Sequence, residues 1–355
     1  MVVLAVGVLV VGAGTMGSAK ANHLPGLGLC GDTITASTTL SADVGPCPSG
    51  GIIIGADNIT LNLNGHRIFG TPAQTDGAGV LLDGRTGVTV KNGTVESFDG
   101  GIAIDGGSAN TVKDMVVQDN VGSLVTDYGE GIGIFVSDDN VLKNNTVRRN
   151  GPYAGIGLYK FTVTGSAGTT TDGNLVQANT VADNNSVPTS VTSNQDDGIR
   201  LEPGVTNNTV SSNTVTGSGL DGIAVFFQAT GNTVSGNTVS GNGNHLFTHR
   251  KGDGIVVFLA ANNTTVSDNT ICGNAANGLR VDSANNTVSS NTAGTGAGCA
   301  QNHANDAAAF EFKDSTALVT DNITTNCNTN NWTGNVTHAA GTPNHAYNNA
   351  CTVKP

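Results

Sequence analysis

Apolar and polar residues alternate along most of the chain, in short runs separated by glycine and asparagine. One kind of run opens with glycine and continues with β-branched or apolar residues, as in GIGI at 131–134 and GIRL at 198–201. The other kind centres on Asn-Thr-Val, as in NTVSSNTV at 208–215. Alternation with a period of two predicts β-strands with one buried side, and the Asn-Gly, Ser-Gly and Asp-Gly pairs between runs predict turns. The pattern excludes helical repeats.

The glycine-initiated strands recur at a nearly constant spacing. Copies that begin at 79, 101, 131, 155, 198, 222, 254 and 278 lie 22, 30, 24, 43, 24, 32 and 24 residues apart. A basic period of 22–24 residues, lengthened at intervals, indicates a solenoid. We expect three short parallel strands in each coil. Ile, Val and Leu would face inward, and asparagines at equivalent turns would form amide ladders between coils.

These repeats, such as NNTVSSNTVTGSGLDGIAV at 207–225, resemble those of right-handed parallel β-helix proteins. The resemblance covers residues 50–327 and implies an all-β fold, a right-handed parallel β-helix (solenoid) of about ten coils with disulfide-tied terminal caps. Proteins of this fold include pectin- and alginate-acting lyases, epimerases, glycoside hydrolases, phage tailspikes and a periplasmic protein of nitrous-oxide reductase maturation. The repeats encode coil packing, and the catalytic motifs of epimerases and polygalacturonases are absent. The activity must therefore be inferred from the site.

The two ends of the chain differ from the repeats. Residues 1–21 are apolar for a dozen positions and end in small residues, which predicts a secretory signal peptide, although its basic start is missing; a buried strand is the alternative. We expect an N-terminal cap at 22–50, the β-helix at 51–327 and a C-terminal cap at 328–355, because the ends of a solenoid must cover open sheet edges. No other segment reaches the ~18 apolar residues of a membrane span.

The six cysteines fit an exported protein in an oxidising compartment, either extracellular or periplasmic. Cys30 and Cys47 flank the N-terminal segment and are expected to pair. The other four pair either as Cys272–Cys299 with Cys327–Cys351 or as Cys299–Cys327 with Cys272–Cys351. Metal binding by these cysteines is disfavoured, since no Cys-x-x-Cys spacing occurs.

The charge balance limits the partners. The 355 residues contain 15 Lys and Arg against 27 Asp and Glu, a formal net charge of −12. This balance argues against a nucleic-acid partner and against docking on anionic membranes. A neutral or cation-bridged polysaccharide remains open as a ligand, and the chain is expected to be a monomer or a homotrimer.

Outward positions of the glycine-initiated strands predict a binding surface. If Ile199 and Leu201 face the core, Arg200 and Glu202 face outward. Equivalent positions in the other coils form two columns, which include the predicted substrate-binding residues Phe135, Tyr159, Phe226, Phe258, Glu202 and Arg280. Exposed aromatic rings in a file would give subsites for a chain of sugars, unless loops or a partner chain cover them.

Four insertions flank this surface and would form the walls of a groove. Segments 121–130, 184–197 and 242–253 precede a strand, and 160–172 follows one. The third segment contributes a basic cluster, in which Arg250 is expected to bind substrate and His249 and Lys251 to take part in catalysis.

The residue before each Gly-Ile forms a further column, which includes Asp197, Asp221 and Asp253, with Asp196 alongside. Strands stack ~4.8 Å apart, so Asp197 would lie one coil from Asp221 and two coils, ~10 Å, from Asp253. These separations bracket those of the carboxyl pairs of glycosidases, and stacked carboxylates raise one another's pKa, which favours a general acid. Alternatively, the same three residues hold Ca²⁺, or they only form turns by bonding their own backbone.

The leading hypothesis is a secreted polysaccharide-active enzyme, either a glycoside hydrolase or a uronate lyase or epimerase. A lyase would use Lys251 or His249 as base, with Arg200 or bound Ca²⁺ neutralising the uronate carboxylate. The alternative is a non-catalytic carbohydrate-binding or surface-interaction module. A structural or metal-delivery role is a third hypothesis, but it lacks the Met, His and Cys ligands expected for copper.

Overall fold

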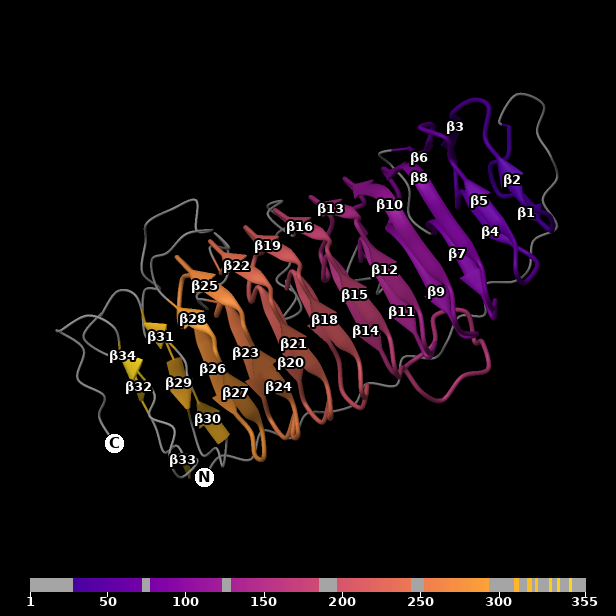
Figure 1. Cartoon of the computed structure of the whole chain (residues 1–355). Helices are drawn as coiled ribbons and strands as arrows, with labels where there is room; N and C mark the ends of the chain where they lie inside the picture. Colours follow the sequence, from indigo (N-terminus) through magenta and orange to yellow (C-terminus); the bar gives the residue numbers. More distant parts are fainter. Residues whose placement is uncertain are drawn as a thin grey trace, which may run out of the picture.

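Parallel β-strands stacked coil upon coil make up the chain in the computed structural model, as Figure 1 shows. The structure describes residues 28–71, 77–122, 129–184, 197–243 and 252–293, together with six short strands between 310 and 346. Among these residues there is no helix, which confirms the predicted all-β parallel solenoid.

One side of the solenoid is a parallel sheet of 12 strands, called sheet 1. It contains the glycine-initiated strands of the repeat. Its members are β1 (Thr33–Ile34), β4 (Ile52–Ile54), β7 (Ala78–Asp83), β9 (Gly100–Asp105), β11 (Ile132–Phe135), β14 (Ile156–Tyr159), β17 (Ile199–Leu201), β20 (Ile223–Phe226), β23 (Ile255–Phe258), β26 (Leu279–Asp282), β29 (Phe310–Phe312) and β32 (Trp332–Thr333).

The Asn-Thr-Val strands form two further rows that close each coil. Row 2 comprises β2 (Thr38–Thr39), β5 (Thr60–Asn62), β12 (Val141–Lys143), β15 (Leu175–Gln177), β18 (Thr209–Ser211), β21 (Thr233–Ser235), β24 (Thr265–Ser267), β27 (Thr287–Ser289), β30 (Leu318–Thr320) and β33 (Thr337–His338). Row 3 comprises β3 (Val44–Cys47), β6 (Arg67–Gly70), β13 (Thr146–Arg148), β16 (Thr180–Ala182), β19 (Thr214–Thr216), β22 (Thr238–Ser240), β25 (Thr270–Cys272), β28 (Thr292–Ala293), β31 (Ile323–Thr324) and β34 (His345–Ala346). The long strands β8 (Thr89–Glu96) and β10 (Thr111–Gln118) contribute to both rows.

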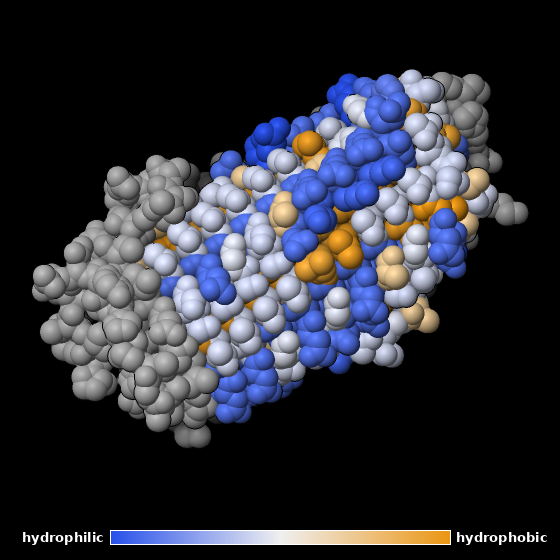
Figure 2. Space-filling model, viewed as in Figure 1, coloured by the Kyte–Doolittle hydropathy of each residue, from blue (hydrophilic) through white to orange (hydrophobic). Residues whose placement is uncertain are grey.

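Alternation along each strand places one apolar file inside and a polar file outside. In β21, Val234 is fully buried, whereas Thr233 and Ser235 on either side are half-buried. Stacking repeats this arrangement, since Val210, Val234 and Val266 occupy equivalent positions in successive coils. The coloured part of the face seen in Figure 2 is accordingly mostly hydrophilic, with hydrophobic residues confined to small areas.

Buried asparagines form the predicted ladders between coils. In one ladder, Asn145 donates from its backbone N–H and its Nδ2 to Asn179 Oδ1, at 2.9 and 3.0 Å. Asn179 bonds Asn213 in the same way, and its Nδ2 also donates to the Leu142 carbonyl at 2.9 Å. Each ladder residue therefore satisfies buried backbone groups at a turn, which would otherwise be costly.

A second ladder runs through Asn110, Asn140 and Asn174. A third ladder runs along the edge where row 3 turns into sheet 1. It consists of Asn120, Asn150, Asn184, Ser218, Asn242 and Asn274. Glycine before the sheet 1 strands of these coils makes room for the ladder, because a Cβ at Gly155 would lie 2.6 Å from Asn184 Nδ2. Ser218 interrupts the ladder, and its hydroxyl is buried without a hydrogen-bond partner.

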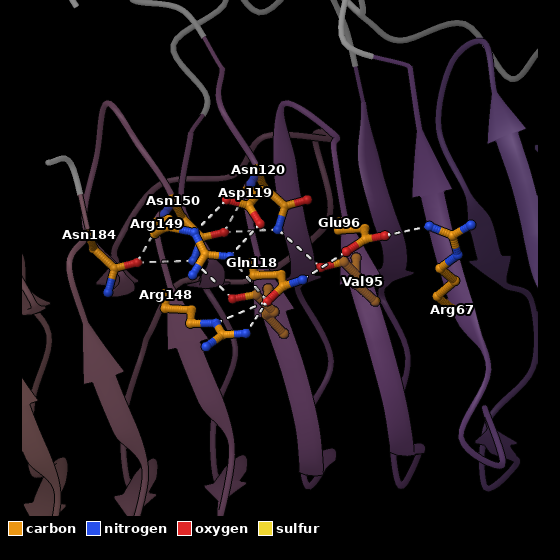
Figure 3. A network of polar contacts seen from close by, with 11 residues as sticks. Arg67, Val95, Glu96, Gln118, Asp119, Asn120, Arg148, Arg149, Asn150 and Asn184 are labelled. Carbon is orange, nitrogen blue, oxygen red and sulfur yellow. Dashed lines mark hydrogen bonds and ion pairs between the residues drawn. The ribbon is translucent and has the colours of Figure 1, made fainter. Parts of the chain in front are cut away.

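Charged side chains bridge the N-terminal coils on the outside. Arg67 Nη1 lies 2.9 Å from Glu96 Oε1, and Gln118 Nε2 donates to Glu96 Oε2 at 2.8 Å. Arg148 donates to Gln118 Oε1, and Arg149 pairs with an aspartate of the preceding coil (Figure 3). Such exposed pairs add little stability individually.

The N-terminal disulfide is confirmed, with Cys30 and Cys47 bonded and their Cα atoms 5.3 Å apart. Cys272 is also disulfide-bonded, and the other three cysteines lie outside the described residues, so the choice between pairings stays open.

The expected signal peptide at 1–21 and much of the expected C-terminal cap also lie outside the described residues. Nothing in the described ranges forms a helix with the length and apolarity that a membrane crossing requires.

Candidate functional site

The predicted columns on the outer side of sheet 1 have the expected register. Gly157 pairs with Arg200 and Arg200 with Ala224, while Phe226 pairs with Phe258. The period of two and the Gly-Ile alignment were therefore sufficient to place these side chains on one surface.

Two of the four aromatic residues are not exposed, contrary to prediction. Phe135 is 1% and Tyr159 0% exposed. Their rings are stacked, 5.1 Å apart, and fold back over the strands that carry them. A Cβ at Gly133 would lie 2.4 Å from the Phe135 ring and one at Gly157 2.3 Å from the Tyr159 ring, so glycine provides the space for each ring.

Segment 160–172, here called the strap, covers these rings. It follows β14 and runs back towards β9 and β7 along the edge of the solenoid (Figure 1). Val163 packs against the Phe135–Tyr159 cluster, and the Phe161 ring centre lies 5.1 Å from that of Tyr159. Thr171 Oγ1 donates to the Tyr159 carbonyl at 2.6 Å. The sequence indicated an insertion here but not the direction in which it folds.

The other two aromatic residues keep part of their surface accessible. Phe226 and Phe258, here called the aromatic pair, are half-buried with ring centres 5.4 Å apart. Arg200 Cζ lies 4.6 Å from the centre of the Phe226 ring, and Arg280 Cζ lies 4.8 Å from that of Phe258. Both arginines thus stack on aromatic rings, which orders the guanidinium groups and the rings together.

Two apolar residues that sequence reasoning missed extend this surface. Phe227 and Leu259 follow the aromatic pair in the turn and are 41% and 43% exposed. Both adopt the left-handed region, with φ of 34° and 49°, which costs a bulky residue about 1–3 kcal/mol. Strained, exposed apolar side chains beside the aromatic pair are typical of a binding surface.

Arg200 connects the aromatic pair to the acidic column. It is 4% exposed, its Nη1 lies 2.6 Å from Asp197 Oδ2, and its Nε pairs with Glu202 Oε1. Burial alone would lower the pKa of Arg200, but the carboxylates of Asp197 and Glu202 outweigh burial and raise it above its usual value. Arg200 is therefore a fixed cation.

Three aspartates, here called the acidic row, occupy successive coils as predicted. Asp221 donates from its backbone N–H to Asp197 Oδ1 at 2.9 Å, and Asp253 donates from its own to Asp221 Oδ1 at 2.6 Å. Asn277 continues the row by donating to Asp253 Oδ1. The expected bond to the residue's own backbone is wrong, because the next coil's N–H is the donor. Because these carboxylate oxygens already accept hydrogen bonds from backbone N–H groups, the predicted Ca²⁺ site in the row gains no support.

Asp221 differs from its neighbours in the row. Asp197 and Asp253 are buried, whereas Asp221 is half-buried. Burial, reinforced by the carboxylates of Asp197 and Asp253, holds the pKa of Asp221 well above its ordinary value. Its Oδ2 makes no hydrogen bond within the described part of the chain, so a proton there can be donated to a ligand.

Glu130, at the equivalent position of an earlier coil, lies beside the covered rings. It is 4% exposed. Burial and then the carboxylates of Glu130 and Glu202 raise the pKa of Tyr159 well above its ordinary value. The raised pKa of Tyr159 thus reflects its burial beneath the strap, which removes Phe135 and Tyr159 from the predicted binding surface.

Four predicted catalytic or binding residues, Asp196, His249, Arg250 and Lys251, lie outside the described residues. The predicted lyase base therefore stays a prediction.

Donors suited to copper are scarce in the described ranges, where no group of three or more His, Cys, Asp or Glu side chains could hold a metal ion. The His66 ring lies 3.4 Å from Asp43 on the outside, and Met115 is buried in the core. Three cysteines are disulfide-bonded. Copper prefers thiolate, thioether and imidazole ligands, and these residues do not bring such a set together.

Comparison with solved structures shows the β-helix fold. The periplasmic alginate epimerase AlgG is similar, with 13% identity and a TM-score of 0.52 over 84% of this chain and 76% of that one. The Dettilon tailspike protein gp208 has 13% identity and a TM-score of 0.53, covering 85% of this chain and 60% of its own. No curated protein matches the sequence.

Family models identify the chain more directly. A model described as "right handed beta helix region" matches residues 184–351, which confirms the family resemblance of the repeats. A second model, described as "periplasmic copper-binding protein (NosD)", matches residues 49–251. Because this second match covers more than half of the 355 residues, the chain belongs to the NosD family of β-helix proteins.

Proposed function

We propose that the chain is exported and binds a polysaccharide on the outer side of sheet 1, where Asp221 acts as proton donor in cleavage of the sugar chain. The observation that carries this proposal is the raised pKa of a half-buried Asp221 close to an accessible aromatic pair. The Cys30–Cys47 disulfide supports export to an oxidising compartment.

Arg200 brings the acidic row and the aromatic pair within reach of one ligand. It lies 2.6 Å from Asp197 on one side and 4.6 Å from the Phe226 ring centre on the other. Asp221 is hydrogen-bonded directly to Asp197. A sugar chain with one ring stacked on Phe226 would extend along Arg200 towards the Asp221 carboxyl group.

The protonation states suit glycosidic hydrolysis. Asp221 would donate a proton from Oδ2 to the leaving glycosidic oxygen, because its raised pKa keeps the carboxyl protonated at higher pH than usual. Glu202, whose Oε1 pairs with Arg200 Nε, supplies the second carboxyl group that a hydrolase also needs. Asp197 is fully buried and bonded to Arg200, so its role is to fix the arginine.

Copper binding, which the description of the family names, has no support from the described donors. A carbohydrate-binding module without catalysis is the alternative, and it uses the same aromatic pair.

Turnover assays on neutral and uronate polysaccharides test the proposal, with reducing ends and the ultraviolet absorbance of unsaturated uronates as readouts. New reducing ends without that absorbance support hydrolysis, and the absorbance itself indicates a lyase. Asp221→Asn should abolish turnover while sugar binding, measured by affinity electrophoresis, persists.

Asp268→Asn, in an exposed turn away from the site, is the matched control and should behave as the parent chain. If the parent chain binds sugars through Phe226 but releases no product, the binding-module alternative is correct. Equal activity in Asp221→Asn and the parent chain would overturn the role of Asp221.

A further inference from the structure

The strap is fastened to sheet 1 by a polar cluster that lies apart from the acidic row. Asp83 of β7 and Asp105 of β9 are paired in register on adjacent strands, so their side chains leave the sheet ~4.8 Å apart. From the strap, Thr164 Oγ1 lies 2.8 Å from Asp83 Oδ1 and 2.7 Å from Asp105 Oδ2. Ser166 Oγ also contacts Asp83 Oδ1. Two carboxylates and two hydroxyl groups therefore meet at one point.

The hydroxyl protons in this cluster are too few for its oxygen atoms. Thr164 has a single hydroxyl proton but approaches an oxygen of each carboxylate within hydrogen-bonding distance. One proton can at best be shared between these two contacts, so neither carboxylate oxygen receives a full hydrogen bond from Thr164. Further positive charge at the cluster would relieve this shortage of donors.

Asp105 shows the same deficit on its other oxygen. The residue is 0% exposed, and its Oδ2 accepts bonds from the strap, including one from Val163 N–H at 2.8 Å. Its Oδ1 is buried and has no hydrogen-bond partner among the residues that the structure describes. Neither Asp105 nor Asp83 forms an ion pair with a basic side chain of the described ranges. A buried, unpaired carboxylate oxygen is strongly unfavourable, so a cationic partner is expected there.

We propose that a divalent cation, Ca²⁺ by its chemistry, binds between the strap and sheet 1 at this cluster. Its ligands are Asp105 Oδ1, the Asp83 carboxylate, and the hydroxyl oxygens of Thr164 and Ser166, with water completing the coordination. Ca²⁺ accepts six to eight oxygen ligands in irregular geometry, whereas Mg²⁺ demands a regular octahedron and gives up its water reluctantly. The hydroxyl protons then turn away from the ion, and the crowded oxygen atoms become ligands.

The ion would fasten the strap over Phe135 and Tyr159. The cluster joins residues far apart in sequence, since Thr162 and Asp105 are separated by 57 positions and Ser166 and Asp83 by 83. Removing the ion would leave two opposed carboxylates beneath the strap and weaken its attachment. This role does not depend on the proposed polysaccharide activity.

Titration of the chelator-treated full chain with CaCl₂ in a calorimeter, together with thermal unfolding with and without Ca²⁺, tests the proposal. We expect one saturable site and a higher unfolding temperature with Ca²⁺. Asp83→Asn should weaken Ca²⁺ binding by at least about tenfold, because one of two carboxylate ligands loses its charge. Asp83 is exposed, so this variant should keep the fold, and circular dichroism checks that it does.

Two controls separate this site from other carboxylates. Asp138→Asn alters a residue that also holds the strap, through Thr170 Oγ1 at 2.8 Å, but lies outside the cluster. Asp221→Asn alters the acidic row. Both should bind Ca²⁺ as the parent chain does, and Thr164→Val should bind it more weakly.

Absence of binding by the parent chain, or equal affinity in Asp83→Asn, would overturn the proposal. Stabilisation of the parent chain by acid but not by Ca²⁺ would also overturn it, because a shared proton would then occupy the cluster.

Discussion

Ser218→Asn should stabilise the protein by completing the third asparagine ladder. At present the Ser218 N–H donates to Asn242 Oδ1 at 3.0 Å, but the Ser218 hydroxyl is buried without a partner. In the coil before it, Asn184 Nδ2 still donates to the Val147 carbonyl, but the Asn184 N–H has no acceptor in the described part of the chain. An asparagine at 218 would supply that acceptor.

The available space is the same as elsewhere in the ladder. A Cβ at Gly198 would lie 2.6 Å from Ser218 Oγ, and a Cβ at Gly155 would lie 2.6 Å from Asn184 Nδ2. The Asn150 side chain accepts two hydrogen bonds from Asn120 and donates two from Nδ2. By analogy, the new side chain gains four hydrogen bonds, two accepted from Asn184 and two donated. At roughly 0.5–1 kcal/mol each, less roughly 1 kcal/mol for ordering the longer side chain, the gain is about 2 kcal/mol.

Urea unfolding at equilibrium measures this gain as a shift of the midpoint at constant slope. Ser41→Asn, the same exchange in an exposed turn at a residue without positive φ, should change the free energy of unfolding by less than about 0.5 kcal/mol. Asn150→Ser should destabilise, because it breaks the ladder where it is now continuous. A neutral or destabilising Ser218→Asn would refute the reasoning that ladder bonds, rather than apolar packing alone, hold adjacent coils together.

Three further predictions concern charge, packing and the N-terminal end. Below pH 3.8, the ordinary pKa of an aspartate, Asp221→Asn should have little effect on the free energy of unfolding. Towards neutral pH the variant should have an increasingly higher free energy of unfolding than the parent chain. The reason is that folded Asp221 in the parent chain retains a proton that the unfolded chain releases, so the stability of the parent chain falls as the pH rises above 3.8. A constant difference in the free energy of unfolding between the two chains at all pH values would contradict this. Gly157→Ala should destabilise by about 1–3 kcal/mol and expose Tyr159, because the new Cβ would lie 2.3 Å from its ring; unchanged near-ultraviolet circular dichroism would argue against it. Replacing Cys30 and Cys47 together by serine should cost about 3 kcal/mol, given their separation of 17 residues, and an unchanged thermal midpoint would show that the disulfide constrains nothing.

The register of the solenoid could be predicted from sequence because it depends on local periodicity. Inward Ile199 and outward Arg200 follow from a period of two, and the Gly-Ile alignment then places equivalent residues of neighbouring coils side by side. The burial of Tyr159 could not be predicted in this way. It depends on the strap folding back over coils that precede it by 57 positions or more, and no periodic signal encodes such contacts.

The acidic row was predicted in position but not in bonding. The spacing of Asp197 and Asp221 correctly placed them in successive coils. The expected bond of each carboxylate to its own backbone overlooked the N–H of the next coil, which lies opposite in a parallel stack. Phe227 and Leu259 gave no signal either, because exposed apolar residues with positive φ in a turn run against ordinary turn chemistry.

The regular spacing of the ladder asparagines affects how such a chain can change in length during evolution. Asn208 and Asn232 are equivalent, as are Asn213 and Asn237, and each pair is 24 residues apart. A tandem genetic duplication of those 24 residues would present the same donors and acceptors at both of its ends. The rod could thus grow or shrink by whole coils through recombination, with these two asparagine ladders continuous across each new junction.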